Sequence, residues 1–330
     1  MRKTQGRVQE AASMGQDFRV GPTCWTAFAR GASELIRDEW ALKLAGEEGA
    51  RLNARFMDDL GARFMKDVVA LRTVYLDNVI QDFVQAGGKQ VVILGAGMDS
   101  RAWRLQRLAR ASRGFTLFEV DEPVLLDMKR ERLGPSVIAQ PLCRRVEIPA
   151  ALTCTEEWGG ALVDHPNFDS SVRSLFLIED VSMYMPEQDF RAALAKVSAL
   201  SARDSIICGD WVPRITVQGK LPGATSDIIA VFGSECNSPW LYGPRNARAF
   251  SNLLKEAGFA TAEQLTSRAI EREVREFLPF GMAQQKIHLS IKSRSWTSYA
   301  AWAMCTFAPA RLCAGAPSDI GLRVYMATRE

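Results

Sequence analysis

The chain has 330 residues, of which 47% are hydrophobic and 24% are charged, the balance of a globular protein that can bury a sizeable core. This composition excludes a disordered or fibrous protein. Its net charge of +3 lacks the broad basic field on which nucleic-acid-binding proteins depend, so we expect no nucleic-acid partner.

Membrane, metal and compartment signals are weak. The apolar runs are far shorter than the roughly 20 residues that span a bilayer, and the polar start, MRKTQGRVQEAASMGQDF, has no signal core. Seven cysteines occur without a Cys-x-x-Cys pair, which indicates a reducing compartment. His165 and His288 are the two histidines, and neither has a second ligand at metal spacing. We therefore expect a cytoplasmic protein with no membrane segment and no metal.

The first long pattern runs from Asp59 to Ala86, where apolar residues recur every three or four positions. This spacing predicts a helix with one buried face, which Gly87 and Gly88 end. The run VVIL at 91–94 predicts a central parallel strand buried on both faces, and Gly95-Ala96-Gly97 stops it.

Further elements follow in alternation. We expect a helix over 102–111, a strand within 115–121 and a helix from Pro123, which suits a first helical turn. The remaining candidates are strands at 144–150, 174–180 and 205–211, helices at 186–200 and 245–261, and a long link at 152–171. Residues 293–308 and 321–330 are candidate strands or a hairpin. This order predicts a doubly wound, Rossmann-like α/β domain with a mostly parallel sheet.

Residues 213–244 are rich in glycine and proline and have no steady period. We interpret them as an irregular insertion near the active face. A solvated loop explains the same pattern equally well.

A glycine turn after the first strand is placed to let a cofactor approach the backbone. Position 100 is serine, so the third glycine of the dinucleotide fingerprint is missing and a pyrophosphate site is disfavoured. Asp121, with Glu119 two residues before it, ends the next strand, where a carboxylate can accept from both hydroxyls of a ribose. A helix cap is the other interpretation of Asp121.

Four ordered blocks resemble the leucine carboxyl methyltransferase family. They are Leu71-Arg72-Thr73 with Leu76-Asp77, VVILGAGMDSRAWRL at 91–105, FEVDEP at 118–123 with Lys129-Arg130, and IEDVSMYMPEQ at 178–188. The resemblance implies a seven-stranded class I methyltransferase sheet and S-adenosyl-L-methionine as cofactor. It also implies an O-methyltransferase acting on a carboxylate or hydroxyl of a small molecule or peptide.

The resemblance also implies roles for single residues. Arg72 would pair with the carboxylate of the methionine moiety, although on its own it could be a surface arginine. Gly95 and Gly97 would line the cofactor, Asp121 would hold the ribose, and Glu179 would lie near the amino group of the cofactor. A lid over the site is implied for residues 1–58, with the methyltransferase domain over 59–330.

Two departures from the family pattern stand out. Ala151 takes the place of the acid that accepts from the adenine amino group, which leaves the backbone of Leu152 to address the ring. A lost hydrogen bond of this kind costs about 1 kcal/mol, so we expect weaker cofactor binding or a substitute acceptor such as Glu156 or Glu157. Asp180 stands where relatives often have glycine.

Methyl transfer to a carboxylate requires no catalytic base, because a carboxylate is already ionised at neutral pH. A hydroxyl acceptor would need one, and the candidates are His165, His288, Tyr184 and Asp180. Arg101 and Arg104 could meet an anionic substrate, or form salt bridges on a helix.

Two other protein classes remain as alternatives. An NAD-dependent oxidoreductase lacks its third glycine and its Tyr-x-x-x-Lys donor in this sequence. A catalytically degenerate methyltransferase fold that only binds a ligand is kept open by Ala151. The sequence leaves the methyl acceptor and the oligomeric state undetermined.

Overall fold

The computed structural model describes residues 20–59, 65–105, 115–220, 224–260, 263–266 and 323–329. Its helices are α2 (Val20–Gly31), α3 (Ala41–Ala54), η1 (Arg55–Asp59), α4 (Met65–Gln85), α5 (Arg101–Arg104), α7 (Pro123–Leu133), α8 (Pro135–Ile138), α9 (Thr155–Val163), η2 (Ser182–Tyr184), α10 (Glu187–Ala199), α11 (Arg214–Val217), α12 (Ala224–Ser234) and α13 (Ala247–Glu256). Its strands are β1 (Gln90–Leu94), β2 (Thr116–Asp121), β3 (Arg144–Pro149), β4 (Ser174–Ile178), β5 (Ile206–Trp211), β6 (Glu263–Thr266) and β7 (Arg323–Thr328).

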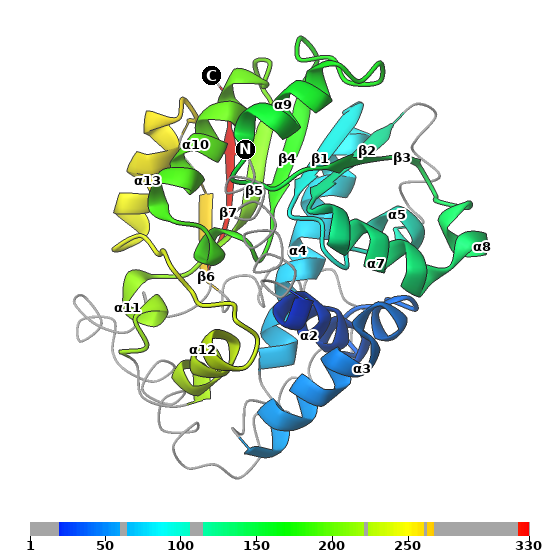
Figure 1. Ribbon diagram of the computed structural model, residues 1–330. Helices are drawn as coiled ribbons and strands as arrows, with labels where there is room; N and C mark the ends of the chain where they lie inside the picture. The colour runs from blue at the N-terminus through cyan, green and yellow to red at the C-terminus, as the bar shows by residue number, and fades with distance from the viewer. Residues whose placement is uncertain are drawn as a thin grey trace, which may run out of the picture.

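The strands form one seven-stranded sheet in the order β3-β2-β1-β4-β5-β7-β6 (Figure 1). The first five are parallel, and β7 runs antiparallel to both β5 and β6. Val92 in the middle of β1 lies opposite Phe118 of β2 and Phe176 of β4. The order turns back between β1 and β4, the kind of switch point at which such sheets bind ligands. This arrangement confirms the predicted doubly wound, mostly parallel sheet.

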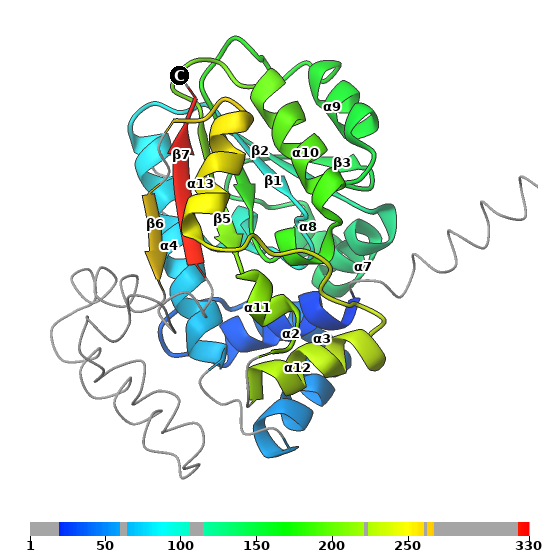
Figure 2. The same cartoon turned by 90° about the vertical axis from the view of Figure 1, so that its left-hand side faces the viewer.

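Helices cover both faces of the sheet, with α4 on one side and α10 and α13 on the other (Figure 2). Trp158 of α9, Phe190 of α10 and Phe250 of α13 belong to one buried cluster. Leu76 of α4 and Leu133 of α7 belong to the opposite one. Because β1 and β4 contribute apolar residues to both clusters, each must be apolar on both faces, which is why their sequences are uninterrupted apolar runs.

A further helical layer lies beyond the carboxyl ends of the strands. It contains α2, α3 and α12, and Figure 2 shows these helices below the sheet. Trp25 of α2, Phe56 of η1 and Phe232 of α12 pack edge to face, with ring centroids 5.2 to 5.9 Å apart. Residues 213–244, which include α11 and α12, thus reach the same region as the N-terminal helices.

Most predicted elements are confirmed, including α4, α7, α10, α13 and the strands from β1 to β5. Gly258 adopts φ +88° just after α13, as expected of a left-handed cap. The predicted link at 152–171 contains the helix α9, which the sequence analysis did not identify. This helix has nine residues and two glycines, too short and irregular a pattern to identify, yet it buries Trp158 and Leu162.

At the end of the chain, the predicted strand at 321–330 is confirmed by β7, whose neighbour β6 we had not predicted. The candidate strand at 293–308 lies outside the described residues, as does most of the helix predicted over 102–111.

Candidate functional site

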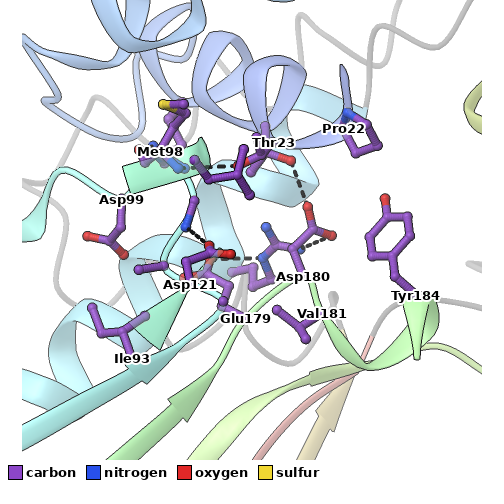
Figure 3. Close-up of a pocket in the computed structure, with 17 residues that line it drawn as sticks. Pro22, Thr23, Ile93, Met98, Asp99, Asp121, Glu179, Asp180, Val181 and Tyr184 are labelled. Carbon is purple, nitrogen blue, oxygen red and sulfur yellow. Dashed lines mark hydrogen bonds and ion pairs between the residues drawn. The ribbon is translucent and has the colours of Figure 1, made fainter. Parts of the chain in front are cut away.

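A pocket opens where β1, β2 and β4 end, and α2 covers it (Figure 3). Five of the six site residues expected from the sequence line it: Arg72, Gly95, Gly97, Asp121 and Glu179. The sixth, Leu152, is not among the lining residues. It is buried beside the turn, with its Cδ1 3.3 Å from where a Cβ on Gly95 would lie.

The glycine turn needs glycine at both ends. Gly95 has φ +79° and Gly97 φ +40°, conformations that residues with a Cβ adopt only at a cost. The Gly95 amide donates to the Val120 carbonyl of β2 at 2.9 Å. The Gly97 amide donates to Asp121 Oδ2 at 2.5 Å. The turn after β1 is therefore fastened to the end of β2.

Asp121 also accepts from the backbone amide of Glu122 at 2.7 Å, through Oδ1. An ionised carboxylate offers about four acceptor positions. Such a group can accept from several donors at once, as the two hydroxyls of a ribose would require.

Arg72 reaches the pocket from α4 and is 2% exposed. Its Nε donates to Glu179 Oε1 at 3.0 Å, and its Nη1 donates to Asp180 Oδ1 at 3.2 Å and to Asp210 Oδ2 at 3.3 Å. Its Nη2 is buried and finds no hydrogen-bond partner within the described part of the chain. Burial lowers the pKa of the guanidinium, but the three acids outweigh this effect and raise it.

Glu179 is held ionised. Besides Arg72, it accepts from Arg101 Nη2 at 2.7 Å and from Thr73 Oγ1 at 3.1 Å. Burial alone would raise the pKa of its carboxyl, but Arg101, Arg72 and Arg30 hold that pKa well below its usual range.

Asp180 has φ +58°, in the left-handed region that favours glycine. Its side chain is 22% exposed and faces the pocket. Its backbone amide donates to Asp210 Oδ1 at 2.6 Å. Asp210, at the end of β5, has a fully buried side chain, and this burial raises the pKa of its carboxyl to about 7 despite the opposing effect of Arg72.

The helix α2 makes three hydrogen bonds to the residues around this site. Thr26 Oγ1 donates to Asp180 Oδ2 at 2.7 Å, Thr23 Oγ1 accepts from the Met98 amide at 3.2 Å, and Arg30 Nη2 donates to the Met98 carbonyl at 2.6 Å. In Figure 3, Asp180 and Tyr184 extend from the strand ends toward Pro22 and Thr23. The pocket is thus enclosed between α2 and the sheet.

Arg101 and Arg104, candidates for an anionic substrate, are buried and paired with acids. Arg101 Nε donates to Asp77 Oδ1 at 2.7 Å, and Arg104 Nη2 donates to the same oxygen at 2.9 Å. Neither arginine lines the pocket. They form salt bridges beneath the glycine turn, within the protein rather than on a helix surface.

Glu119 is not among the residues that line the pocket. Its Oε2 accepts from Lys129 Nζ at 2.9 Å and from Arg145 Nη2 at 2.6 Å, and both Glu119 and Lys129 have fully buried side chains. Lys129 Nζ also donates to the Ala96 carbonyl at 3.4 Å. Lys129 thus connects the buried carboxylate of Glu119 to the glycine turn.

Of the candidate bases, Asp180 and Tyr184 line the pocket. His165 does not: it lies 5.5 Å from the ring of Phe118, edge to face. His288 lies outside the described residues. Glu156 pairs with Lys196 of α10 at 2.7 Å and is 88% exposed, so it does not replace the acid missing at position 151.

Sequence reasoning missed several residues of the site. Asp210 is an acid at the carboxyl end of a buried strand, and its position in the run SIICGDW was a signal that could have identified it. Thr23, Thr26 and Arg30 belong to a helix whose polar side chains follow no pattern that marks a site.

No group of three histidine, cysteine or acidic side chains in the described residues is arranged to hold a metal ion. No helix there is both long and apolar enough to cross a bilayer.

The model of the leucine carboxyl methyltransferase family matches residues 19–198. A similar protein of Mycobacteroides abscessus is 37% identical over 169 residues, which are 51% of this chain and 53% of that protein. One of Mycobacterium avium is 34% identical over 193 residues, 55% of this chain and 61% of that one. Both are provisionally named S-adenosyl-L-methionine-dependent methyltransferases. The chain therefore spans little more than half the length of these relatives.

Two solved structures share the fold. A DUF574 family protein of Streptomyces avermitilis has a TM-score of 0.57 at 11% identity, covering 94% of this chain and 97% of that one. A provisionally named methyltransferase of Thermobifida fusca has a TM-score of 0.52 at 12% identity, covering 93% and 94%. At such low identity the likeness concerns the fold alone.

Proposed function

This chain belongs to the leucine carboxyl methyltransferase family, and from that premise we propose that it is an S-adenosyl-L-methionine-dependent O-methyltransferase. Its acceptor is a carboxylate or a hydroxyl of a small molecule or peptide. The observation that carries the proposal is the pocket that Arg72 and Asp121 line together with the glycine turn.

The residues of this pocket fit the cofactor. A buried guanidinium nitrogen without a partner among the described residues, Nη2 of Arg72, can donate to the carboxylate of a methionine moiety. Glu179, whose carboxyl pKa is held well below its usual range, offers an ionised carboxylate to the ammonium group of that moiety. Gly95 and Gly97 let the ligand approach the backbone, and Asp121 accepts from the ribose.

The adenine end is the weakest part of the fit. Ala151 has no side-chain acceptor, and the Leu152 carbonyl already accepts from Trp158 Nε1 at 3.1 Å. The backbone amide and the buried side chain of Leu152 are left to address the ring. We expect cofactor affinity to be reduced by the loss of one hydrogen bond, about 1 kcal/mol.

The cofactor, when bound, supplies a methyl group on a positively charged sulfur. The task of the protein is to align the acceptor oxygen with that methyl group and to exclude water, and alignment alone can be worth about 7 to 11 kcal/mol. An ionised carboxylate needs no base. For a hydroxyl, the carboxylate of Asp180 is the pocket residue that can take the proton.

We also assign the two parts of the chain. Residues 1–58 serve as a lid, and residues 59–330 form the methyltransferase domain with an insertion at 213–244. The lid is supported by the hydrogen bond from Thr26 to Asp180 across the pocket. Its contact with the insertion is supported by the packing of Trp25 against Phe232.

A cytoplasmic location goes with this proposal. Five cysteines in the described residues are free thiols, as suits a reducing compartment.

Calorimetric titration with S-adenosylmethionine and S-adenosylhomocysteine tests the proposal, followed by transfer of a labelled methyl group to small carboxylates and hydroxyls. Asp121→Ala removes the carboxylate, and hydrogen bonds to a charged group are worth about 1.5 to 3 kcal/mol each, so affinity should fall at least tenfold. Asp127→Asn, on the exposed side of α7, is the matched control and should bind as the wild type does.

Binding without transfer to any acceptor would favour the degenerate fold that only binds the ligand. An absence of binding by a folded wild-type protein would refute the cofactor assignment. In that case Ala151→Asp is the first variant to make, because it restores the acid missing from the adenine end.

A further inference from the structure

The guanidinium of Arg72 is surrounded by three carboxylates from two strand ends. Glu179 accepts from Nε, while Asp180 and Asp210 share Nη1. One of its nitrogens, Nη2, is left for a ligand. A ligand carboxylate placed there would be the fourth negative group around a single positive charge, in an interior where charges interact strongly.

The three carboxylates differ in support. Glu179 is neutralised by a second arginine, since Arg101 donates to it at 2.7 Å. Asp180 is 22% exposed, so water solvates its charge. Asp210 has neither advantage: its side chain is fully buried, and the cation that it contacts, Arg72, is shared and 3.3 Å away. Asp210 is therefore the carboxylate whose charge is held least well.

We propose that Asp210 is a further residue of the ligand site and takes up a proton when a ligand carboxylate binds to Arg72. The inference rests on the function proposed above, because that function supplies a ligand with a carboxylate. In its protonated form Asp210 still accepts from the Asp180 amide through Oδ1, so the hydrogen bond that fixes the loop after β4 survives.

The groups that face Asp210 come from three other parts of the fold. Arg72 of α4 is the positive one, and Glu179 and Asp180 after β4 are negative. Tyr325 of β7 lies close enough for Asp210 to contribute to a raised pKa of its phenol, after the larger effects of burial and Cys208. Arg72 is the cation that acts on the pKa of Asp210 itself, while Arg101 and Arg30 of α2, which also lines the pocket, act on Glu179.

The direction of the pH dependence follows. Burial already brings the pKa of Asp210 to about 7 in the free protein, and a ligand carboxylate on Arg72 raises it further. Above pH 7, binding must then be accompanied by proton uptake, and the dissociation constant should rise by up to about tenfold per pH unit. Below this range Asp210 is protonated in both states, and its contribution to the pH dependence disappears.

Calorimetry of the full chain tests this proposal with two probes. S-adenosylhomocysteine carries the amino-acid end, and 5′-methylthioadenosine lacks it. Each titration is run at pH 8 in phosphate and in Tris, whose heats of ionisation differ, so that the difference in apparent enthalpy counts the protons. We expect uptake with S-adenosylhomocysteine, much less with methylthioadenosine, and a loss of the uptake in Asp210→Asn.

The Asp210→Asn variant removes one source of ambiguity. The amino group of the ligand can also gain a proton beside Glu179, and this contribution persists in the variant. The difference between wild type and variant is therefore the signal. Asp127→Asn is the exposed control, and an unfolding scan checks that Asp210→Asn is folded.

Equal proton uptake in the wild type and the folded variant would overturn the proposal, as would binding of S-adenosylhomocysteine to the wild type without any uptake at pH 8. These wild-type measurements hold even if the variant does not fold. No binding of S-adenosylhomocysteine at all would instead contradict the cofactor assignment on which the inference rests.

Discussion

The carboxylate of Asp121 accepts a hydrogen bond from the amide of Gly97 at 2.5 Å, so the residue that ends β2 also fixes the turn that follows β1. These two residues are 24 positions apart in the sequence, and they follow or end adjacent parallel strands, Gly97 after β1 and Asp121 at the end of β2. The shape of the pocket floor thus depends on the same carboxylate that we assign to ligand binding.

Gly97→Ala should disrupt both the turn and the lid. An added Cβ would lie 2.3 Å from Thr23 Oγ1 of α2, and φ is +40°. We expect affinity for S-adenosylhomocysteine to fall by about tenfold or more, measured by calorimetry. Gly87→Ala is the control, because Gly87 has φ +87° but open space around it, so it should lose about 1 to 2 kcal/mol of stability and no affinity. Unchanged binding in Gly97→Ala would contradict the packing described here.

Thr26→Val removes the hydroxyl that ties α2 to Asp180 while keeping the shape of the side chain. Because the lost hydrogen bond has a charged acceptor, about 1.5 to 3 kcal/mol is at stake. We expect faster amide hydrogen exchange in α2 and faster release of bound S-adenosylhomocysteine. Thr153→Val makes the same chemical change at an exposed position and should alter neither. If α2 exchanges at the same rate in both variants, Thr26 does not fasten the lid.

The buried ion pair behind the turn predicts an order of stabilities. Glu119→Gln leaves Lys129 buried without its carboxylate, and breaking such a pair costs about 3 to 5 kcal/mol. Lys129→Met should cost less, because Arg145 still pairs with Glu119 at 2.6 Å. Urea unfolding measures both free energies. A larger loss in Lys129→Met than in Glu119→Gln would reverse the predicted order and show that Arg145 does not compensate.

Protein stability should depend on pH through Asp210 even without ligand. The pKa of the Asp210 carboxyl is about 7 in the folded protein, against an ordinary value of 3.8. Its stabilising contribution is therefore full below pH 3.8 and is lost as pH rises through 7. The contribution of Glu179, whose pKa lies below 4.5, is constant above that pH. We expect the melting temperature to fall from pH 5 to 8 in the wild type and to fall less steeply in Asp210→Asn. Parallel curves would contradict the assignment.

Much of the fold could be predicted because the core strands are apolar on both faces. β1 and β4 read as continuous apolar runs, and α4 shows its buried face as a spacing of three and four. The helix α9 was not predicted because nine residues with two glycines give no clear helical period. The strand β6 was not predicted because four residues are too few to show an alternating pattern. Their positions are set by tertiary contacts such as the burial of Trp158, which no local pattern contains.

The candidate site was predictable only where a motif marks it. The glycine turn and Asp121 follow from strand ends, and Arg72 and Glu179 came from the family blocks. The contacts between these residues could not be predicted. A sequence does not show that Arg72 contacts Glu179, Asp180 and Asp210 at once, because these residues lie 107, 108 and 138 positions away from it. For the same reason, the sequence did not show that Glu119, the other acid near the end of β2, pairs with Lys129 and Arg145.

The position of β7 in the sheet determines when the last strands can pair during synthesis. This strand lies between β5 and β6 in the sheet, yet it leaves the ribosome after both of them. Until it arrives, β6 has no strand to pair with, and the stack of Trp211 on Phe250 lacks Tyr325, whose ring closes it at 4.8 Å from Phe250. A growing chain therefore carries an open sheet edge and bare aromatic rings, the kind of surface that chaperones cover during translation.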